Sequence, residues 1–340
     1  MRLLFCGGGT GGHLFPGIAL AERRDVGSVH FLCTPRALDR SELGRRGFPF
    51  TPVGRWEIRK AVRTVQFFAP DVAVMLGGGG AIPGLLASAA LRLPYVCLEQ
   101  NVVPGRLTRL AARGARRLYA QWRESRRYLG GTNGRFVWAG SPLRKLPFRD
   151  AGEARRRYAL DPDRPTILVL GGSQGSEAIN RRLPEWAGAL PGPVQFLHLA
   201  GVDKGADEVR TGYRSAGVPA SVLEFEPEME WAYSAADAAV ARAGAITLAE
   251  LCRFRIPALL IPYPHAKDDH QAANALALAR AGAAWAVRQE GFRREILRAW
   301  GEALVSGNEI LDNMREALAA FDRPGAEDFI LRDLRERIAS

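Results

Sequence analysis

Short, mainly apolar runs alternate with amphipathic segments along most of the chain. In the first part, these runs occupy residues 3–6, 29–33, 72–76 and 95–98, and each is followed by Gly, Pro or polar residues. A strand pattern that alternates with helical segments predicts an α/β protein with a parallel sheet. The loops after such strands meet at the carboxyl edge of the sheet, where α/β proteins bind their ligands.

The same pattern begins again after the segment GSPLRKLPFRD at residues 140–150. Residues 165–172, PTILVLGG, lead into SQGSEAIN much as RLLFCGG leads into GTGGHLFP at residues 2–16. Further strands are predicted at residues 194–199, 221–225, 238–241 and 258–261. The repetition predicts a second parallel sheet of the same kind.

The last part of the chain is predicted to be helical. This pattern starts at residue 291, and Pro324 and Gly325 precede a final amphipathic segment, AEDFILRDLRERIAS. We therefore predict two Rossmann-like domains, residues 1–144 and 145–325. The final helix, residues 326–340, is expected to pack back on the first domain.

The length and the apolar content of the chain are compatible with two hydrophobic cores. The chain has 340 residues, of which 47% are hydrophobic. Residues 72–91 are uncharged and long enough to cross a bilayer. Four consecutive glycines and Pro83 favour instead a strand, a loop and a buried helix. The N-terminus does not resemble a secretory signal, so we predict neither a signal peptide nor a transmembrane segment.

The four cysteines point to an intracellular protein without disulfides. Cys6, Cys33, Cys97 and Cys252 are scattered and form no C-x-x-C pair. This usage predicts reduced, buried thiols in a cytoplasmic protein, rather than a disulfide framework or a metal site.

The first glycine cluster matches a dinucleotide-binding fingerprint. Gly7, Gly9 and Gly12 form G-x-G-x-x-G directly after the first predicted strand. A dehydrogenase also needs an acidic residue after the second strand to bind the ribose, but residues 34–36 are Thr-Pro-Arg. The second glycine cluster would have no role in such an enzyme. We therefore disfavour a nicotinamide enzyme.

The second glycine cluster predicts a diphosphate site. Residues 171–175, GGSQG, follow an apolar strand, and their backbone N–H groups can surround an anion. A tight turn without a ligand is the alternative. Glu250, in RAGAITLAEL, is placed to accept hydrogen bonds from ribose hydroxyls, although a helical glutamate without that role is also possible.

A third cluster, DDHQAAN, suits a sugar. His270, Gln271 and Asn274 share one helical face, so the amides can reach sugar hydroxyls together. A metal site at residues 268–270 is the alternative, but no further His or Cys is clustered with it. In the first domain, His13 follows Gly12 at the start of a predicted helix, where a neutral imidazole can act as a general base. A structural cap is the alternative for His13.

Six segments, in this order, resemble the MurG family of GT-B glycosyltransferases. They are residues 7–22, 98–115, 140–144, 171–180, 241–251 and 265–275. The resemblance implies two Rossmann-like domains facing an interdomain cleft. It also implies inverting transfer of N-acetylglucosamine from UDP-GlcNAc to the 4-hydroxyl of MurNAc in lipid I, forming lipid II of peptidoglycan synthesis. Another GT-B protein (a UDP-GlcNAc 2-epimerase or a glycolipid transferase) and a non-catalytic UDP-GlcNAc- or lipid-binding paralogue are the alternatives.

The resemblance also implies a set of site residues. His13 is the expected catalytic residue, with Glu99 as a weaker acid/base candidate. The residues expected to bind substrate are Thr10, Gly11, Gly12, Asn101, Arg144, Ser173, Gln174, Asn180, Glu226, Ala245, Ile246, Thr247, Leu248, Glu250, Gln271 and Asn274. No organic cofactor is implied, and a divalent cation can accompany UDP without a protein ligand site.

Five positions depart from the family pattern. Leu98 replaces a histidine, Ser141 replaces an asparagine, and Gly79 and Gly80 belong to an altered GGGGAIPG segment. Glu226 stands where a small apolar residue usually lines the uracil pocket. The acceptor side is therefore the part of the site for which the resemblance is least informative.

The net charge of +11 indicates an acidic partner. Residues 106–127 hold eight arginines against one acid, Glu124, interleaved with Leu, Tyr and Trp, and residues 56–68 mix cations with Trp and Phe. Cations beside aromatic residues suit an anionic membrane surface. We predict a peripheral protein on the cytoplasmic face of the cell membrane, with a solvated basic helix as the alternative. No nucleic-acid motif accompanies the charge.

Overall fold

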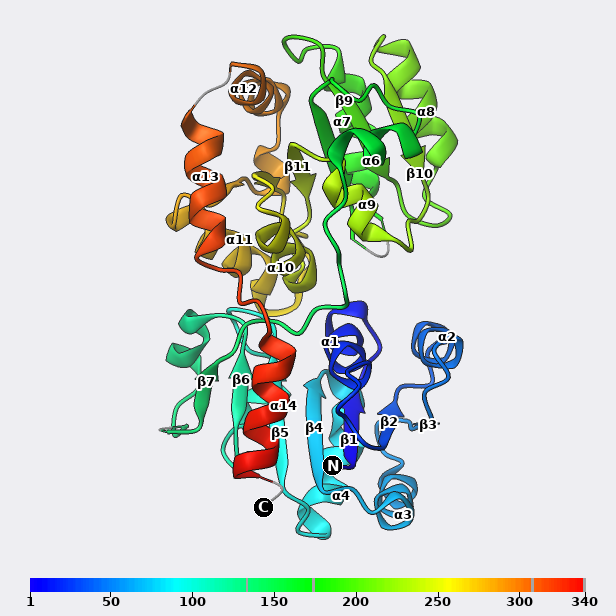
Figure 1. Cartoon of the computed structure of the whole chain (residues 1–340), viewed down its shortest axis with the longest axis vertical. Helices are drawn as coiled ribbons and strands as arrows, with labels where there is room; N and C mark the ends of the chain where they lie inside the picture. Colours follow the sequence, from blue (N-terminus) through cyan, green and yellow to red (C-terminus); the bar gives the residue numbers. More distant parts are fainter. Residues whose placement is uncertain (133, 173–174, 307–308, 339–340) are drawn as a thin grey trace. The chain divides into compact units, whose positions relative to one another are not determined.

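The computed structural model describes residues 1–132, 134–172, 175–306 and 309–338. The chain divides into two compact units (Figure 1). Unit 1 consists of Met1–Lys145 and Arg323–Ser340, and unit 2 consists of Leu146–Asp322.

Unit 1 is built on one parallel sheet. Its strands are β1 (Leu3–Gly7), β2 (Val29–Cys33), β3 (Phe50–Pro52), β4 (Val72–Gly77), β5 (Tyr95–Glu99), β6 (Leu118–Ala120) and β7 (Phe136–Trp138). The order is β3-β2-β1-β4-β5-β6-β7, and all neighbours are parallel. The strands are added outwards from β1 through β2 to β3, and then from β4 on the other side of β1. The carboxyl ends of β1 and β4 therefore form the topological switch point, where such folds bind ligands.

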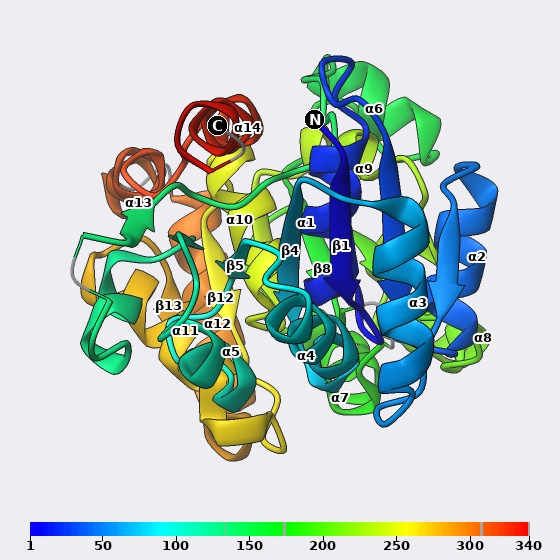
Figure 2. The same ribbon diagram turned by 90° about the horizontal axis from the view of Figure 1, so that it is seen from below.

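Helices cover both faces of this sheet (Figures 1 and 2). One face is covered by α1 (Gly11–Ala21), α2 (Ala37–Arg45) and α14 (Ala326–Arg337). The other is covered by α3 (Ile58–Phe68), α4 (Ile82–Ala90) and α5 (Arg106–Ala111). Two short 3-10 helices, η1 (Gly79–Ala81) and η2 (Arg123–Tyr128), complete the unit.

The central strand β1 shows why both faces need cover. Leu3 and Phe5 belong to the core under α1 and α14, whereas Leu4 and Cys6 belong to the core under α3 and α4. All four side chains are 0% exposed. Successive side chains of a strand point to opposite faces, and parallel strands buried on both faces are apolar throughout.

Helix α14 is an integral part of unit 1. Ile330, Leu331 and Leu334 are fully buried in the core that contains β1. The hydroxyl of Tyr119, on β6, donates a hydrogen bond of 2.7 Å to Asp333 of α14. Figure 1 shows this red helix beside β5 and β6.

Unit 2 repeats the arrangement with a six-stranded sheet. Its strands are β8 (Thr166–Leu170), β9 (Gln195–Leu199), β10 (Ala220–Leu223), β11 (Ala238–Ala241), β12 (Ala258–Leu260) and β13 (Trp285–Ala286). The order is β10-β9-β8-β11-β12-β13, again parallel. The switch point therefore lies between β8 and β11.

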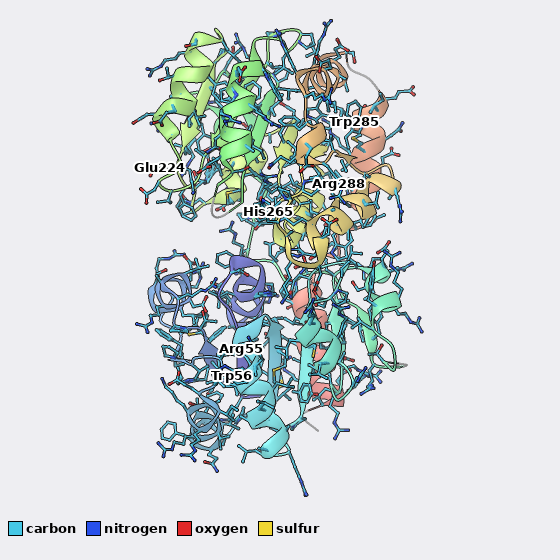
Figure 3. The ribbon with its side chains drawn as sticks, turned by 180° about the vertical axis from the view of Figure 1, so that it is seen from behind. Arg55, Trp56, Glu224, His265, Trp285 and Arg288 are labelled. Carbon is cyan, nitrogen blue, oxygen red and sulfur yellow. The ribbon has the colours of Figure 1, made fainter. Side chains whose placement is uncertain are left out.

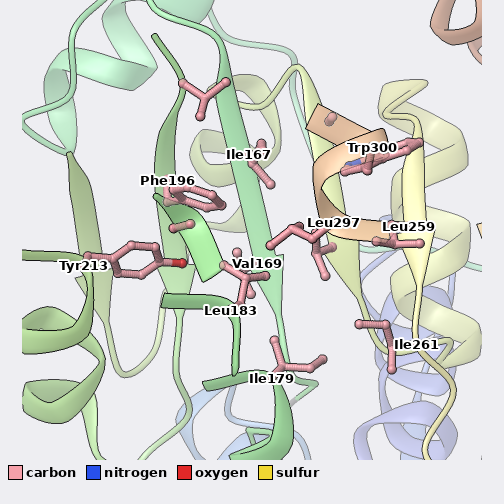
Figure 4. Packing of buried hydrophobic residues seen from close by; sticks show 14 of the residues in the cluster. Ile167, Val169, Ile179, Leu183, Phe196, Tyr213, Leu259, Ile261, Leu297 and Trp300 are labelled. Atoms are coloured by element: carbon pink, nitrogen blue, oxygen red, sulfur yellow. The ribbon is translucent and has the colours of Figure 1, made fainter. Parts of the chain in front are cut away.

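The α-helices of unit 2 are α6 (Ala151–Arg157), α7 (Glu177–Ala187), α8 (Ala206–Ser215), α9 (Met229–Ser234), α10 (Ala245–Phe254), α11 (His270–Arg280), α12 (Arg294–Val305) and α13 (Glu309–Ala319), with 3-10 helices η3 (Lys267–Asp269) and η4 (Gln289–Gly291). Helices α7, α8, α12 and α13 bury one large core against this sheet. Figure 4 shows Phe196 of β9, Ile167 of β8 and Leu297 of α12 in this core.

The predicted α/β class with two parallel sheets is confirmed. The prediction of buried free thiols is also confirmed, because all four cysteines are free and buried. Residues 72–91 form β4, η1 and α4, as predicted. Among the described residues, no helix combines the length and the apolar character needed to cross a bilayer.

The interpretation of residues 106–127 as one basic and aromatic face needs correction. This segment contains α5, strand β6 and η2. Tyr119 and Trp122 are only 1% and 2% exposed, so these aromatic rings belong to the interior. For Tyr119 the strand β6 requires this, because its side chains alternate between the two covered faces of the sheet.

Candidate functional site

The glycine cluster after β1 forms the tight turn that begins α1. Gly7, Gly8 and Gly9 all have positive φ, at 134°, 141° and 84°. A Cβ at Gly7 would lie 2.8 Å from the carbonyl oxygen of Gly77, at the end of β4. Only glycine fits this crowded backbone, which brings the turn to the switch point of unit 1.

Thr10 and His13 stand at the start of α1. Thr10 is the N-cap, and its carbonyl accepts hydrogen bonds of 3.1 Å from the N–H groups of His13 and Leu14. The His13 ring packs against Gly77 and Gly78, because a Cβ on either glycine would lie 3.1 Å from a ring atom. Gly11 and Gly12 form the first turn of the same helix. These expected site residues therefore share one corner of unit 1.

Asp39 was missed by the sequence analysis. It lies on α2 and is fully buried. Its carboxylate accepts hydrogen bonds from the N–H of Gly9 at 2.8 Å and 2.9 Å and from the N–H of Thr34 at 2.9 Å. In a dinucleotide-binding enzyme, the N–H groups of this glycine turn would bind the phosphates of the cofactor. Here the N–H of Gly9 already donates to Asp39, which argues further against a dehydrogenase. Asp39 belongs to no sequence motif, because only the fold brings it into contact with the glycine turn.

Glu99 organises the loop that contains Asn101. It ends β5 and is 4% exposed. Its Oε1 accepts from the N–H of Asn101 at 2.9 Å, and its Oε2 accepts from the N–H of Gly105 at 3.2 Å. Burial raises the pKa of Glu99, although the hydrogen bonds from Asn101, Thr108 and Gly105 oppose this. Leu98, which replaces the family histidine, is buried in the core.

The segment that holds Ser141 and Arg144 is anchored by α14. The N–H of Leu143 donates a hydrogen bond of 2.5 Å to Glu327, and burial raises the pKa of that carboxyl group. Ser141 is buried and Arg144 is half-buried. Gly79 and Gly80 lie in η1, directly after β4.

In unit 2, the second glycine cluster follows β8 at the switch point. Ser173 and Gln174 lie outside the described residues. Gly172 and Gly175 have φ of 83° and 70°, and the N–H of Gly175 donates to the carbonyl of Gly172 at 2.9 Å. Ser176 caps α7 by accepting from the N–H of Ile179 at 3.4 Å.

A buried arginine stands behind this glycine cluster. Arg242 follows β11 and is 6% exposed. Its guanidinium donates to Ser176 Oγ at 2.7 Å, to Gln289 Oε1 at 2.6 Å, and to the carbonyl oxygens of Ile261 and Pro262 at 3.0 Å and 3.1 Å. Burial lowers the pKa of Arg242. Within the described part of the chain no carboxylate pairs with Arg242, so it contributes positive potential at the switch point.

Glu250 is held by a tyrosine. It lies on α10, is 6% exposed, and its Oε2 accepts a hydrogen bond of 2.6 Å from the hydroxyl of Tyr233. The expected contacts of the first turn of α10 differ in exposure, since Ala245 and Leu248 are buried whereas Ile246 and Thr247 are half-buried. Tyr233 has no place in any motif and was also missed by the sequence analysis.

The two amides of the sugar cluster have different surroundings. Gln271 Oε1 accepts from the N–H of Tyr263 at 2.9 Å, and Gln271 is half-buried. Asn274 is 0% exposed, and its Nδ2 donates to the carbonyl of Ala243 at 3.2 Å. Asn274 therefore holds the backbone of the loop between β11 and α10 by this hydrogen bond. The nearby Arg288 and His265 are both exposed (Figure 3).

Asn180 and Glu226 are engaged within unit 2. Asn180 Nδ2 donates to the carbonyl oxygens of Ala200 and Lys204 at 2.9 Å and 3.0 Å, and its Oδ1 lies 3.1 Å from His198 Nε2. Glu226 accepts from the hydroxyl of Tyr158 at 2.8 Å and from the N–H of Glu228 at 2.7 Å. Asn180 therefore holds the loop after β9, and Glu226 holds the loop after β10.

A cavity of about 550 Å³ lies elsewhere in unit 2. It is lined by residues that follow β9 and β10 and by the start of α8, including Val202, Arg210 and Phe225. None of the expected site residues lines it. No cluster of three or more potential metal ligands occurs among the residues that the structure describes.

Known proteins match the chain in sequence and in structure. Residues 3–55 match the glycosyltransferase family 28 N-terminal domain, and residues 166–329 match the C-terminal domain of the same family. The chain is 35% identical to the UDP-N-acetylglucosamine--N-acetylmuramyl-(pentapeptide) pyrophosphoryl-undecaprenol N-acetylglucosamine transferase of Myxococcus xanthus, over 96% of this chain and 90% of the relative. It is 34% identical to the protein of the same name from Prosthecochloris aestuarii, over 100% and 98% of the two chains.

Two solved structures illustrate the structural similarity. Acinetobacter baumannii MurG superposes with a TM-score of 0.81 at 27% identity, covering 98% of this chain and 99% of the other. UDP-GlcNAc 2-epimerase from Neisseria meningitidis, solved with UDP-GlcNAc, gives a TM-score of 0.71 at 13% identity over 99% and 100% of the chains. The second similarity shows the fold alone.

Proposed function

This chain belongs to the MurG family of glycosyltransferases, and from that premise we propose that it transfers N-acetylglucosamine from UDP-GlcNAc to lipid I and so forms lipid II of peptidoglycan synthesis. The observation that carries the proposal is the 35% identity over 96% of the chain to a transferase named for that reaction. The arrangement of polar residues at the two switch points supports it.

The reaction is an inverting displacement. The 4-hydroxyl oxygen of MurNAc attacks the anomeric carbon of N-acetylglucosamine from the face opposite UDP. A new carbon–oxygen bond forms while the bond to the β-phosphate oxygen breaks, and the electron pair leaves with UDP. The imidazole of His13 accepts the hydroxyl proton, because a neutral histidine can act as a base near neutral pH.

We assign the UDP part of the donor to unit 2. The loop after β8 supplies backbone N–H groups for the diphosphate, and Arg242 adds a buried positive charge behind Ser176. Glu250 accepts the ribose hydroxyls, in an orientation that Tyr233 fixes. The Oε1 of Gln271 is engaged by Tyr263, so its amide nitrogen is the group that donates to a sugar hydroxyl.

Glu99 is assigned a supporting role rather than that of the base. Each of its oxygens accepts a backbone N–H from the loop between Asn101 and Gly105. Glu99 therefore fixes the positions of Asn101 and the start of α5. Since both of its oxygens are engaged in this way, His13 is the proposed base. We also assign Arg144 to the donor, where its guanidinium stabilises the charge that develops on the leaving diphosphate.

The test measures UDP release and formation of the disaccharide lipid product from UDP-GlcNAc and a short-chain lipid I analogue. We expect acceptor-dependent turnover that His13→Gln lowers strongly in kcat and Glu250→Gln weakens through the KM for UDP-GlcNAc. His30→Gln, on β2 of the same unit, and Glu302→Gln, an exposed residue of α12, are the matched controls. Consumption of UDP-GlcNAc without acceptor would indicate an epimerase, and binding without turnover would indicate a non-catalytic paralogue.

A second part of the proposal concerns an anionic membrane surface. We define the membrane face as Trp56 and Phe67 with Arg59, Lys60 and Arg63, on and beside α3. Trp56 and Phe67 are 72% and 93% exposed, and the three cations are exposed as well. Arg55 and Trp56 are labelled in Figure 3, and the Arg55 guanidinium lies 5.0 Å from the centre of the Trp56 ring. Exposed aromatic residues among cations suit the interface of an anionic bilayer.

Vesicle co-sedimentation tests the membrane face. We expect the protein to bind vesicles that contain phosphatidylglycerol more strongly than phosphatidylcholine vesicles, and less strongly as salt increases. Phe67→Ser should weaken binding, whereas Phe329→Ser, which removes a 42% exposed aromatic residue of α14, should not. If both variants lost vesicle binding equally, α3 would not be the membrane-binding element. The proposed reaction would be unaffected by that result.

A further inference from the structure

The carboxylate of Asp39 accepts hydrogen bonds on both of its oxygens. It is 0% exposed. Beyond the bonds to the N–H groups of Gly9 and Thr34, its Oδ2 accepts a hydrogen bond of 2.7 Å from Thr34 Oγ1. No ion pair to a Lys or Arg accompanies these bonds among the described residues. Hydrogen-bond donors arranged in this way offset the free-energy cost of burying the carboxylate.

The glycine turn is shaped around this carboxylate. A Cβ at Gly8 would lie 2.3 Å from Asp39 Oδ2, so no side chain fits between the turn and α2. The next residue, Gly9, is held from two sides: Asp39 accepts from its N–H, and Arg36 Nη1 donates to its carbonyl oxygen at 2.8 Å. Two consecutive peptide planes are thereby fixed.

The fixed peptides lead directly to His13. The carbonyl group of Thr10, the residue after Gly9, accepts the N–H groups of His13 and Leu14 and so sets where α1 begins. The direction of the His13 side chain depends on that start, because the ring lies against Gly77 and Gly78 with little free space. A rotation of the Gly9 peptide would therefore move the imidazole.

We infer that Asp39 is a positioning residue for His13, acting through the backbone of Gly9 and Thr10. The inference rests on the proposed role of His13 as the base. Asp39 itself touches no substrate. Its contribution is to hold the imidazole where it can accept the proton of the acceptor hydroxyl, and small displacements of a catalytic group have large effects on the chemical step.

The decisive variant is Asp39→Asn, which keeps the size of the side chain but replaces one acceptor by an NH2 group facing N–H donors. We expect kcat to fall by about 100-fold, with the Kd for UDP-GlcNAc unchanged because the donor site is assigned to unit 2. Asp25→Asn is the matched control, since Asp25 is an exposed aspartate of the same unit that pairs with Arg335 at 2.6 Å. The control should retain wild-type kcat and Kd.

A second variant keeps the test valid if Asp39→Asn does not fold. Arg36 is exposed, so Arg36→Met should fold, and it releases the Gly9 carbonyl without disturbing the buried carboxylate. We expect a several-fold fall in kcat with unchanged UDP-GlcNAc affinity. The imidazole resonances of His13, assigned through His13→Gln, should shift in both variants while those of the other histidines stay in place.

Two results would overturn the inference. One is wild-type kcat in Asp39→Asn and Arg36→Met. The other is a parallel loss of kcat and UDP-GlcNAc binding, which would indicate general disruption. If His13→Gln retains full kcat, the proposed base is wrong, and the His13 resonances still decide separately whether Asp39 positions this ring.

Discussion

His198 makes the stability of unit 2 dependent on pH. This side chain of β9 is 0% exposed, and it lies between Asn180 Oδ1, at 3.1 Å from Nε2, and the hydroxyl of Tyr213, at 3.0 Å from Nδ1. Burial lowers its pKa from 6.5 to about 3. The folded protein therefore keeps the ring neutral at pH values where the unfolded chain binds a proton.

The sign and the size follow from proton linkage. The folded pKa is the lower one, so the stabilising contribution is present above pH 6.5 and is lost as the pH falls towards 3. At about 1.36 kcal/mol per pH unit, the complete loss is about 5 kcal/mol. Between pH 7 and pH 5 the expected loss is about 2 kcal/mol, which is a large share of the stability of an ordinary domain.

The assay compares the intact protein with His198→Gln, which retains a polar side chain but does not titrate. Hydrogen-exchange mass spectrometry over a urea series, followed on peptides from β8 and β9, gives the unfolding free energy of unit 2 at pH 7 and pH 5. The intact protein should lose about 2 kcal/mol more than the variant over this range. His265→Gln, which removes an exposed histidine of unit 2, should behave like the intact protein. Equal losses in the intact protein and His198→Gln would refute the reasoning.

Three further predictions concern the switch points and the place where the chain re-enters unit 1 at Arg323. Tyr233→Phe should raise the Kd for UDP-GlcNAc by roughly 10-fold, because a hydrogen bond to a charged group is worth about 1.5–3 kcal/mol, and calorimetry showing unchanged affinity would contradict the role given to Glu250. Arg242→Lys should lower both thermal stability and UDP affinity, since an ammonium cannot replace the forked contacts of the guanidinium; wild-type values in thermal denaturation and titration would count against this. Gly140→Ala should lower the Tm, because φ is 84° and the new Cβ would lie 2.4 Å from Cβ of Arg323; a Tm equal to that of the intact protein would show that the contact relaxes freely.

The central strands could be predicted from the sequence because their pattern is long and apolar. Residues 29–33 and 238–241 form strands with the predicted bounds, and β1 extends the predicted run by one residue. These strands are buried on both faces, so burial requires continuous apolar runs that are visible in the sequence.

Four short strands could not be predicted, whereas β12, which also has three residues, lies within the predicted apolar run 258–261. Strands β3, β6 and β7 have three residues each, and β13 has two. Such lengths are too short for a periodicity, and their pairing depends on neighbours that the fold brings beside them. Strand β6 was hidden further by the arginines around it, which favoured a surface interpretation of Tyr119.

The candidate site was predictable where it lies in a glycine-rich motif and not where it depends on tertiary contacts. The sequence analysis placed His13 at the start of a helix and Glu250 within one, as the structure has them. It missed Asp39 and Tyr233, and it included Arg242 in the RAGAITLAEL motif without predicting its contacts, because the partners of all three lie in segments brought together only by folding. The roles of all these residues stay predictions until the variants are measured.

The return of the chain into unit 1 has a consequence for biosynthesis. The core of unit 1 needs Ile330, Leu331 and Leu334 of α14, yet the chain leaves this unit after Lys145 and re-enters it at Arg323. At about 5–20 residues per second on the ribosome, synthesis of Leu146–Asp322 takes about 10–35 s. During that interval one apolar face of the first sheet is without its last helix. A nascent chain is therefore a substrate for chaperones until α14 emerges, and truncation before Arg323 would leave the same surface open to proteases.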